Sequence, residues 1–365
     1  MKKLKIKKPY KAIIIFVLTI VFVRCAGSLT RFSDAVFPSL NNFFAKIMYS
    51  FSSWFNFSVG DVFYTFIALG GIFFIVNFIK LILKKKKDKI ARQISILFYF
   101  LTGFYLIFYL FWGFNYYKTP LKENYNTENI RIEELKNLAE IYLKKSIEDR
   151  AEVSENQDGV YEFKLNQKQI DSLISESSKK LRLYYKELKF TNQISPNVKQ
   201  SQYSTLFSYL GVLGYYNPFT NEGQYNNKMP ATKVLFTQMH ETAHQWGFAP
   251  ENEANFIGFL IGTENKSIDF NYVCHYMALR QILNRIVWED PEFVEQLMDR
   301  YSAGMKRDRA YEIKIQLKYN HTADDAFSML NEAYLRLNNQ EGLESYGKFV
   351  ELLIGYNRKY SINKQ

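Results

Sequence analysis

Three uninterrupted apolar runs in the first third of the chain constrain its fold more than any other feature. They cover residues 12–23 (AIIIFVLTIVFV), 62–79 (VFYTFIALGGIFFIVNFI) and 94–114 (ISILFYFLTGFYLIFYLFWGF). A helix of about 20 apolar residues crosses the hydrocarbon of a bilayer with every backbone amide hydrogen-bonded internally. We therefore predict transmembrane helices near residues 11–29, 62–83 and 94–115. The first run also fits a signal peptide, because a basic segment precedes it.

Two lysine clusters carry the net charge of +11. Six lysines lie within residues 1–11 and a net charge of +6 lies within residues 80–92, so the remainder of the chain is close to neutral. That remainder has no basic face for a nucleic-acid backbone, which argues against a nucleic-acid partner. Positively charged loops stay in the cytoplasm, so both clusters are predicted to be cytoplasmic. Counting crossings places residues 28–61, and everything after residue 117, outside the cytoplasmic membrane.

The membrane part, residues 1–117, is interpreted as a multi-pass anchor in the lipid bilayer. Its apolar runs hold almost no ionisable side chains, whereas a transporter would need such groups at depth. Between the first two runs, residues 38–55 repeat apolar positions at helical spacing, with aromatic side chains on one side. This pattern predicts an amphipathic helix that either lies in the outer interface or packs on the exterior domain.

Residues 118–365 are predicted to form one extracytoplasmic domain that is rich in helix. A polar linker at 118–129 precedes helices at 130–148 and 167–188, and Asn166 is suited to cap the second. The aromatic and β-branched content of residues 202–216 predicts a strand. Further helices are expected at 271–288, 291–303, 309–318, 322–338 and 343–360. The predicted fold class is a mainly α membrane protein, in which three N-terminal transmembrane helices precede an α+β domain.

The sequence HETAH at residues 240–244 is the strongest chemical signal in the chain. On a helix, His240 and His244 project from one face about one turn apart, so that both imidazoles can reach one Zn²⁺. Glu241 is then placed to act as a general base on a zinc-activated water. The chain has only four histidines, and two of them lie here. The motif predicts a catalytic zinc site on a helix that ends at Gly247.

A catalytic zinc site needs a third protein ligand, and the segment PENEANFIG directly after the motif offers two glutamates. Glu251 shares a helical face with Asn255, Gly258 and Gly262, a strip of small residues that lets two helices approach closely. Glu253 shares its face with larger apolar residues. We therefore expect Glu251 to be the ligand, with Glu253 as the alternative. Asn255, one turn further on, is expected to orient a ligand histidine.

An HExxH motif followed by a glutamate resembles the gluzincin type of zinc metallopeptidase. The segment ENEAN, residues 251–255, is similar to the Glu-x-x-Ala-Asp segment of membrane peptidases related to the CAAX prenyl proteases, although those enzymes have a longer insertion before it. This resemblance implies a zincin-like domain with Glu251 as a ligand and Asn255 in place of an aspartate. More closely, the stretches GYYNPFTNE and HETAHQWGFAPENEANFIGFL, after three membrane runs, resemble a family of bacterial membrane proteins of unknown function.

Together these patterns predict a membrane-anchored, zinc-dependent hydrolase, most simply a metallopeptidase with a peptide or protein substrate. The predicted strand is suited to pair with an extended substrate. The candidates for a donor to the developing oxyanion are Tyr215, Tyr216, His275 and Tyr346. Two alternatives stay open: a non-catalytic membrane scaffold that keeps a zinc site, and a zinc amidase that acts on cell-wall peptide. The sequence predicts neither the substrate nor the oligomeric state.

Overall fold

The apolar runs fold into three long helices, as the sequence predicts. A computed structural model, which describes residues 9–191, 194–319 and 347–361, places them at α1 (Tyr10–Gly27), α3 (Val59–Leu83) and α4 (Lys87–Phe111). Each is long and apolar enough to cross a membrane. The most apolar window of α3 has no buried residue, and large side chains such as Phe66 and Phe73 are exposed. Such a surface is unfavourable in water, which suggests membrane insertion.

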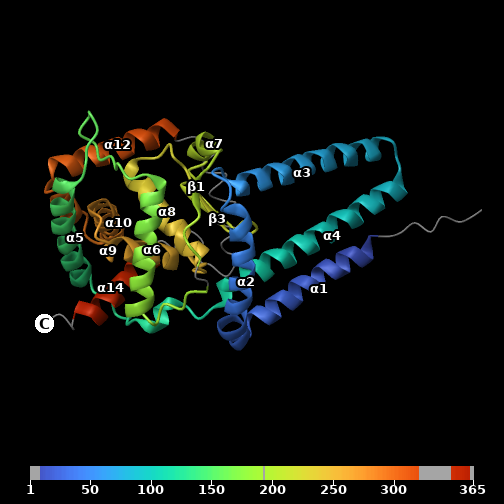
Figure 1. Cartoon of the computed structure of the whole chain (residues 1–365), viewed down its shortest axis with the longest axis horizontal. Helices are drawn as coiled ribbons and strands as arrows, with labels where there is room; N and C mark the ends of the chain where they lie inside the picture. Colours follow the sequence, from blue (N-terminus) through green and yellow to red (C-terminus); the bar gives the residue numbers. More distant parts are fainter. Residues whose placement is uncertain (1–8, 192–193, 320–346, 362–365) are drawn as a thin grey trace, which may run out of the picture.

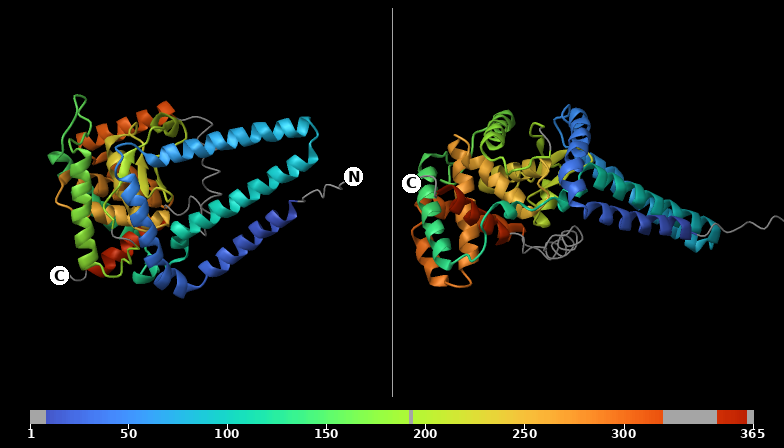
Figure 2. Two further views of the ribbon diagram at one scale, coloured as in Figure 1. Left: turned by 45° about the vertical axis from the view of Figure 1, so that its right-hand side comes forward. Right: turned by 90° about the horizontal axis from the view of Figure 1, so that it is seen from below.

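The three long helices leave the same side of a helical domain (Figure 1). The helices α3 and α4 are joined by a lysine-rich turn at the end far from the domain, and α1 lies along α4 (Figure 2). Near that turn the side chain of Gln93 donates to the carbonyl of Phe74 and accepts from Asn77. Gln93 and Asn77 are therefore hydrogen-bonded to each other or to backbone, as a hydrocarbon environment requires.

The predicted amphipathic helix is α2 (Phe37–Ser52), and it has two different faces. It runs across the domain end of the long helices (Figure 1). One face is bonded to both parts of the protein, because Asn41 donates to the carbonyl of Phe111 and Asn221 donates to that of Ala45. The other face exposes Phe43 and Phe51. The helix therefore packs on the domain, and it also presents an aromatic face of the kind that an interfacial helix has.

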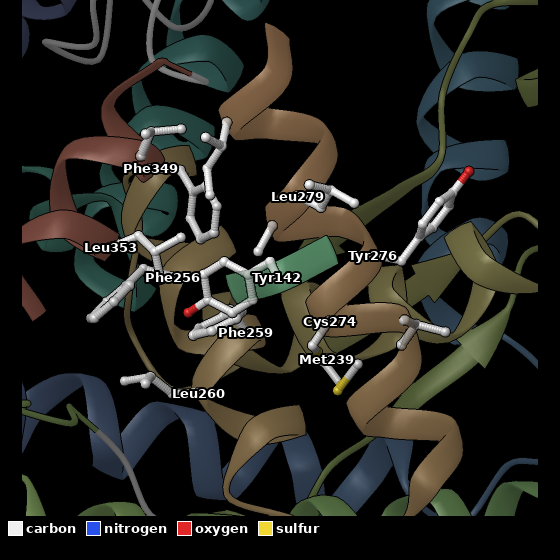
Figure 3. Packing of buried hydrophobic residues seen from close by; sticks show 14 of the residues in the cluster. Tyr142, Met239, Phe256, Phe259, Leu260, Cys274, Tyr276, Leu279, Phe349 and Leu353 are labelled. Atoms are coloured by element: carbon white, nitrogen blue, oxygen red, sulfur yellow. The ribbon is translucent and has the colours of Figure 1, made fainter. Parts of the chain in front are cut away.

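The domain is built mainly from helices, with a core where they cross. Three short helical turns precede it: η1 (Phe32–Val36), η2 (Gly113–Tyr117) and η3 (Leu121–Asn124). The described helices of the domain are α5 (Ile132–Glu152), α6 (Gln167–Tyr184), α7 (Ser204–Tyr209), α8 (Ala231–Gln245), α9 (Glu251–Thr263), α10 (Ile268–Ile286), α11 (Pro291–Asp299), α12 (Ala303–Tyr319) and α14 (Gly347–Ser361). Figure 3 shows part of this core, in which Phe259 of α9 packs against Tyr142 of α5 and Phe349 of α14.

Most helix predictions for this domain are confirmed. The helices α5, α6, α10, α11 and α12 lie at the predicted positions with ends shifted by a few residues. The side chain of Asn166 accepts from the backbone of Gln169 and caps α6 as predicted. The helix expected at 322–338 lies outside the described residues, and of the helix expected at 343–360 the structure describes α14.

The strand predicted over residues 202–216 is wrong for most of its length. Residues Ser204–Tyr209 form α7, and only Gly214–Asn217 form a strand, β2. The aromatic residues of this segment suggested a strand, but its buried polar residues have helical spacing. Ser204 and Ser208 are both buried, and the hydroxyl of Ser208 donates to the carbonyl of Ser204 four residues earlier.

The small sheet has the order β1-β3-β2, which leaves β2 at an edge. The strand β1 (Val198–Gln200) is parallel to β3 (Glu222–Tyr225), and β2 is antiparallel to β3 with Tyr216 opposite Gly223. In Figure 1 the sheet lies between the helical core and the ends of the long helices. It is therefore placed to connect them.

The sheet is bonded directly to the start of α3. The carboxylate of Glu222 accepts from the backbone of Gly60 at 2.6 Å and from Lys199 at 2.6 Å. The carboxylate of Asp61 accepts from the backbone of Gln202 at 2.7 Å and from the hydroxyl of Tyr215 at 2.7 Å. Acidic groups at a helix N-terminus are stabilised by the helix dipole. These bonds fix the long helices and the sheet to each other.

The segment 118–129, predicted to be a polar linker, is instead packed against the domain. It contains η3, and its side chains Leu121 and Tyr125 are buried in the core. The backbone nitrogen of Leu121 donates to Glu253 at 2.7 Å. The polar composition of this segment gave no indication that Leu121 and Tyr125 are core residues.

Candidate metal centre

The histidines of the HETAH motif lie on α8, and a sharp turn brings α9 back beside them. Gly247 ends the helix region with a φ of +93°, a conformation that favours glycine, and a Cβ there would lie 2.4 Å from that of Thr191. The helix α9 then begins at Glu251. The two helices approach closely at Gly258, where a Cβ would lie 3.2 Å from the backbone nitrogen of His240. The strip of small residues thus allows the predicted close packing.

This packing brings three potential metal ligands together. Nε2 of His240 lies 3.3 Å from one carboxylate oxygen of Glu251, and Nε2 of His244 lies 3.6 Å from the other. One ligand atom from each of the three residues lies within 4.8 Å of the others. Two imidazoles and a carboxylate with such spacing match the three-ligand sets of catalytic zinc sites.

The other ring nitrogens are held by the protein. Nδ1 of His244 lies 2.7 Å from the backbone carbonyl of Phe248, and Nδ1 of His240 lies 2.9 Å from Oδ1 of Asn255. A carbonyl oxygen only accepts, so Nδ1 of His244 carries a proton, and Nε2 is the nitrogen that faces Glu251 and could bind a metal once it is deprotonated. Asn255 thus takes the orienting position that the sequence predicts for it. Such outer partners fix the tautomer and the ring orientation of metal-binding histidines.

The charges at this cluster favour an ionised carboxylate between two imidazoles. Burial acts to raise the pKa of Glu251, but His244 and His240 outweigh it and hold that pKa well below its usual range. Burial acts to lower the pKa of His244, but the Glu251 carboxylate raises it to about 9. Glu251 and His244 therefore stabilise each other's charged forms, and a bound cation would take the place of the imidazolium proton.

Glu241 contacts the sheet. A Cβ at Gly214 of β2 would lie 2.7 Å from Oε1 of Glu241, and a Cβ at Gly223 of β3 would lie 2.7 Å from its Cβ. Both glycines leave room for this side chain, and neither was among the candidate residues predicted from the sequence. Burial raises the pKa of Glu241 to about 7, against the opposing effect of His240 and His244. Among the described residues, its Oε2 has no hydrogen-bond partner.

A buried acceptor without a partner is costly, so such groups commonly serve a function. Glu241 is almost fully buried, and it directly follows the ligand candidate His240 on α8. A carboxylate with a pKa near 7 is well suited to accept and return a proton at neutral pH. This is the chemistry that the sequence predicts for Glu241.

The residues at the end of α4 border the centre, a contact that was not predicted from the sequence. Nε1 of Trp112 donates to the backbone carbonyl of His244 at 3.2 Å, and its ring lies 6.1 Å from the His244 ring. The same ring lies 5.3 Å from that of Tyr216 on β2. The candidate centre is therefore in direct contact with the last residues of a long apolar helix.

The alternative ligand and the oxyanion candidates have other partners. Glu253 accepts from the backbone of Leu121, away from the three ligands. Tyr215 donates to Asp61, and Tyr216 donates to Asn221 at 2.7 Å. Nδ1 of His275 pairs with Asp149 of α5 at 2.6 Å. Tyr346 lies outside the described residues. Among these, the geometry favours Glu251 over Glu253 as the third ligand, and it favours none of the described oxyanion candidates.

Replacing Asn255 by alanine is expected to weaken zinc binding by about 10- to 100-fold, because Nδ1 of His240 loses the partner that orients the ring. Asn255→Asp is the matched control, since a carboxylate can accept the same hydrogen bond. Competition with a zinc-binding dye would measure both affinities. Equal affinities for the wild type and the alanine variant would contradict the orienting role.

Comparison with known proteins shows the family to which the chain belongs. A family model described as a protein of unknown function (DUF3810) matches residues 36–354, which include α2, α3 and α4 as well as the candidate centre. No curated protein and no solved structure matches the chain. Because the match covers most of its length, the chain belongs to the DUF3810 family of proteins of unknown function.

Proposed function

We propose that this protein is a membrane-anchored, zinc-dependent hydrolase, and that it is a peptidase with a zincin-like, gluzincin-type site. The observation that carries the proposal is the convergence of both Nε2 atoms on the Glu251 carboxylate while both Nδ1 atoms are engaged elsewhere. An ordinary pair of core histidines does not need this arrangement.

The residues present fit a zinc ion. His240, His244 and Glu251 would hold it, and their donor set of two nitrogens and one oxygen is one that catalytic zinc sites use. A bound zinc ion would supply Lewis-acid activation of a water molecule and of the substrate carbonyl. The unpaired Oε2 of Glu241 further supports the assignment, because it is an acceptor in need of a proton donor.

In this mechanism Glu241 handles the proton. Its carboxylate accepts the proton of the attacking water, holds it in a buried environment, and delivers it to the leaving amine. Gly214 and Gly223 keep the space in which that carboxylate moves. Asn255 and the carbonyl of Phe248 keep the imidazoles in place during the reaction.

The first test is the metal content of the full chain purified in detergent. We expect one zinc ion per chain, hydrolysis of an unstructured polypeptide, loss of that activity with a chelator and its return with added zinc. Protein without zinc affinity would overturn the proposed site. Protein that binds zinc but does not cut a broad peptide library would favour the scaffold, and cleavage of cell-wall peptide alone would favour the amidase.

We also propose that the domain lies outside the cytoplasmic membrane, because the lysine-rich turn between α3 and α4 is at the opposite end of these helices. Single cysteines at Trp288, which is 87% exposed, and at Lys85 test this in a Cys25→Ser background. In intact cells a membrane-impermeant maleimide should label the Trp288→Cys variant, and the Lys85→Cys variant only after permeabilisation. The reverse pattern would place the domain in the cytoplasm.

A further inference from the structure

The turn between β2 and β3 reaches between two of the long apolar helices. Phe219, in that turn, stacks on Phe63 of α3 with ring centroids 5.1 Å apart and packs on Phe104 of α4 at 4.6 Å. Phe104 lies seven residues before the end of α4, which is about 10 Å of helix. If α3 and α4 span a membrane, Phe219 lies below the level at which α4 ends, among apolar side chains.

The strand β2 therefore connects the candidate centre to the membrane helices. Its first residue, Gly214, lies against Glu241. Two residues on, the ring of Tyr216 packs on Trp112 at the end of α4, and Asn217 donates to the carbonyl of Gly60 in α3. The strand itself, from Gly214 to Asn217, spans about 10 Å, and the turn that follows carries the chain on to Phe219. One short strand thus leads from the proposed general base to the level of the hydrocarbon.

One edge of β2 has backbone groups that face away from the sheet. In an antiparallel pair, residues alternate between those bonded to the partner strand and those that face outward. The backbone of Asn226 donates to the carbonyl of Leu213 at 2.8 Å, so Tyr215 faces β3 as well. Gly214 and Tyr216 consequently present their N–H and C=O groups on the outer edge. Among the described strands, β3 alone pairs with β2.

We propose that the substrate is a membrane-anchored polypeptide, cut within roughly three to five residues of the point where it leaves the outer surface of the membrane. Its extended segment would add to the outer edge of β2 and so run from the hydrocarbon at Phe219 to Glu241. The chemistry is peptide hydrolysis, in which water adds across one amide bond to give a carboxylate and an amine. This inference rests on the proposed hydrolase function and on the proposed sidedness.

The test uses the full chain in proteoliposomes with three substrate libraries. The first joins a helix of about 20 leucine and alanine residues to a randomised exterior segment. The second inserts about a dozen glycine and serine residues between the two. The third is the randomised segment alone. Mass spectrometry gives the cleavage positions and rates, and the Glu241→Gln variant gives the background.

We expect cleavage a fixed few residues from the anchor in both anchored libraries, so that the cut falls within the spacer of the second. The unanchored segment should be cut at least about tenfold more slowly at equal concentration, since it lacks the high effective concentration that anchoring gives. Cleavage spread along the segment, or equal rates with and without the anchor, would overturn the inference while leaving the hydrolase proposal intact.

A binding measurement separates the two proposals when no cleavage occurs. A photo-crosslinking residue in place of Leu213, which is 39% exposed just before β2, reports contacts in the Glu241→Gln variant. Cross-links at a fixed distance from the anchor would support the substrate class without turnover. Cross-links at positions unrelated to the distance from the anchor, or equal cross-linking of the soluble segment, would reject the proposed substrate class.

A matched pair of variants tests the edge itself. Tyr216→Ala and Tyr216→Pro both remove the ring, but only proline removes the N–H that faces away from β3. The proline variant should cut the anchored library about three- to tenfold more slowly than the alanine variant, as the loss of one backbone hydrogen bond implies. Equal rates, with similar thermal stability, would show that the substrate does not pair with this edge.

Discussion

Replacing Glu241 by glutamine is expected to lower kcat by about 10²- to 10⁴-fold while zinc affinity stays close to that of the wild type. Glutamine has the same shape but cannot accept the proton of the attacking water at neutral pH. Glu241 is not among the three side chains whose ligand atoms converge, so its replacement leaves the metal ligands in place. Hydrolysis of an unstructured polypeptide and dye-based zinc titration measure the two quantities.

The same substitution should leave stability unchanged or raise it. Glu241 is buried, burial raises its pKa, and one carboxylate oxygen lacks a partner, so the wild type carries an unfavourable group in its interior. A neutral amide reduces that cost, as is common where function requires a destabilising residue. If the variant loses both thermal stability and zinc affinity by a large amount, Glu241 is a structural residue. Full activity of the variant would remove it from the mechanism.

The residues of the candidate centre could be predicted because their spacing is local. His240 and His244 are four residues apart on one helix, and Glu251 follows after a short turn that Gly247 ends. Helical periodicity then places Asn255 one turn beyond Glu251, beside His240. No long-range information was needed, since a helical hairpin with a strip of small residues has few ways to pack.

The surroundings of the centre depend on contacts between distant segments, and the sequence did not reveal them. Trp112 and Gly214 reach the centre from α4 and from β2, which are more than a hundred residues apart in the chain. A tryptophan at the end of an apolar helix is typical of a membrane interface, so its hydrogen bond to the carbonyl of His244 had no local signal. Glu222 and Asp61, which join the sheet to α3, look like ordinary surface acids when the sequence is read alone.

The strand predicted at 202–216 failed for a related reason. Aromatic and β-branched residues favour strands because they pack well on a half-buried pleated surface. Here Phe207 packs edge-to-face on Tyr215, so one part of the segment folds back over the other as a short helix and a strand. Local composition could not distinguish a long strand from these two shorter elements.

Replacing Glu251 by alanine is expected to weaken zinc binding by more than about 100-fold, because a direct ligand should matter more than the partners that orient one. Both of its carboxylate oxygens face an imidazole, 3.3 Å from Nε2 of His240 and 3.6 Å from that of His244. Its removal leaves two histidines, which is one protein ligand short of a catalytic zinc site. Zinc titration with a competing dye measures the loss, and hydrolysis should disappear with it.

Glu253→Gln is the control for Glu251→Ala, because Glu253 lies two residues further along the same helix. Its carboxylate accepts from the backbone of Leu121, and Lys118 is a neighbouring charge. The variant should keep zinc affinity and activity, and lose no more than about 1 kcal/mol of stability, because the amide oxygen of glutamine can still accept the hydrogen bond from Leu121. Thermal unfolding measures that change. If zinc affinity instead falls in Glu253→Gln and persists in Glu251→Ala, the third ligand is Glu253, and α9 must turn or shift from the position in which Glu251 meets both histidines.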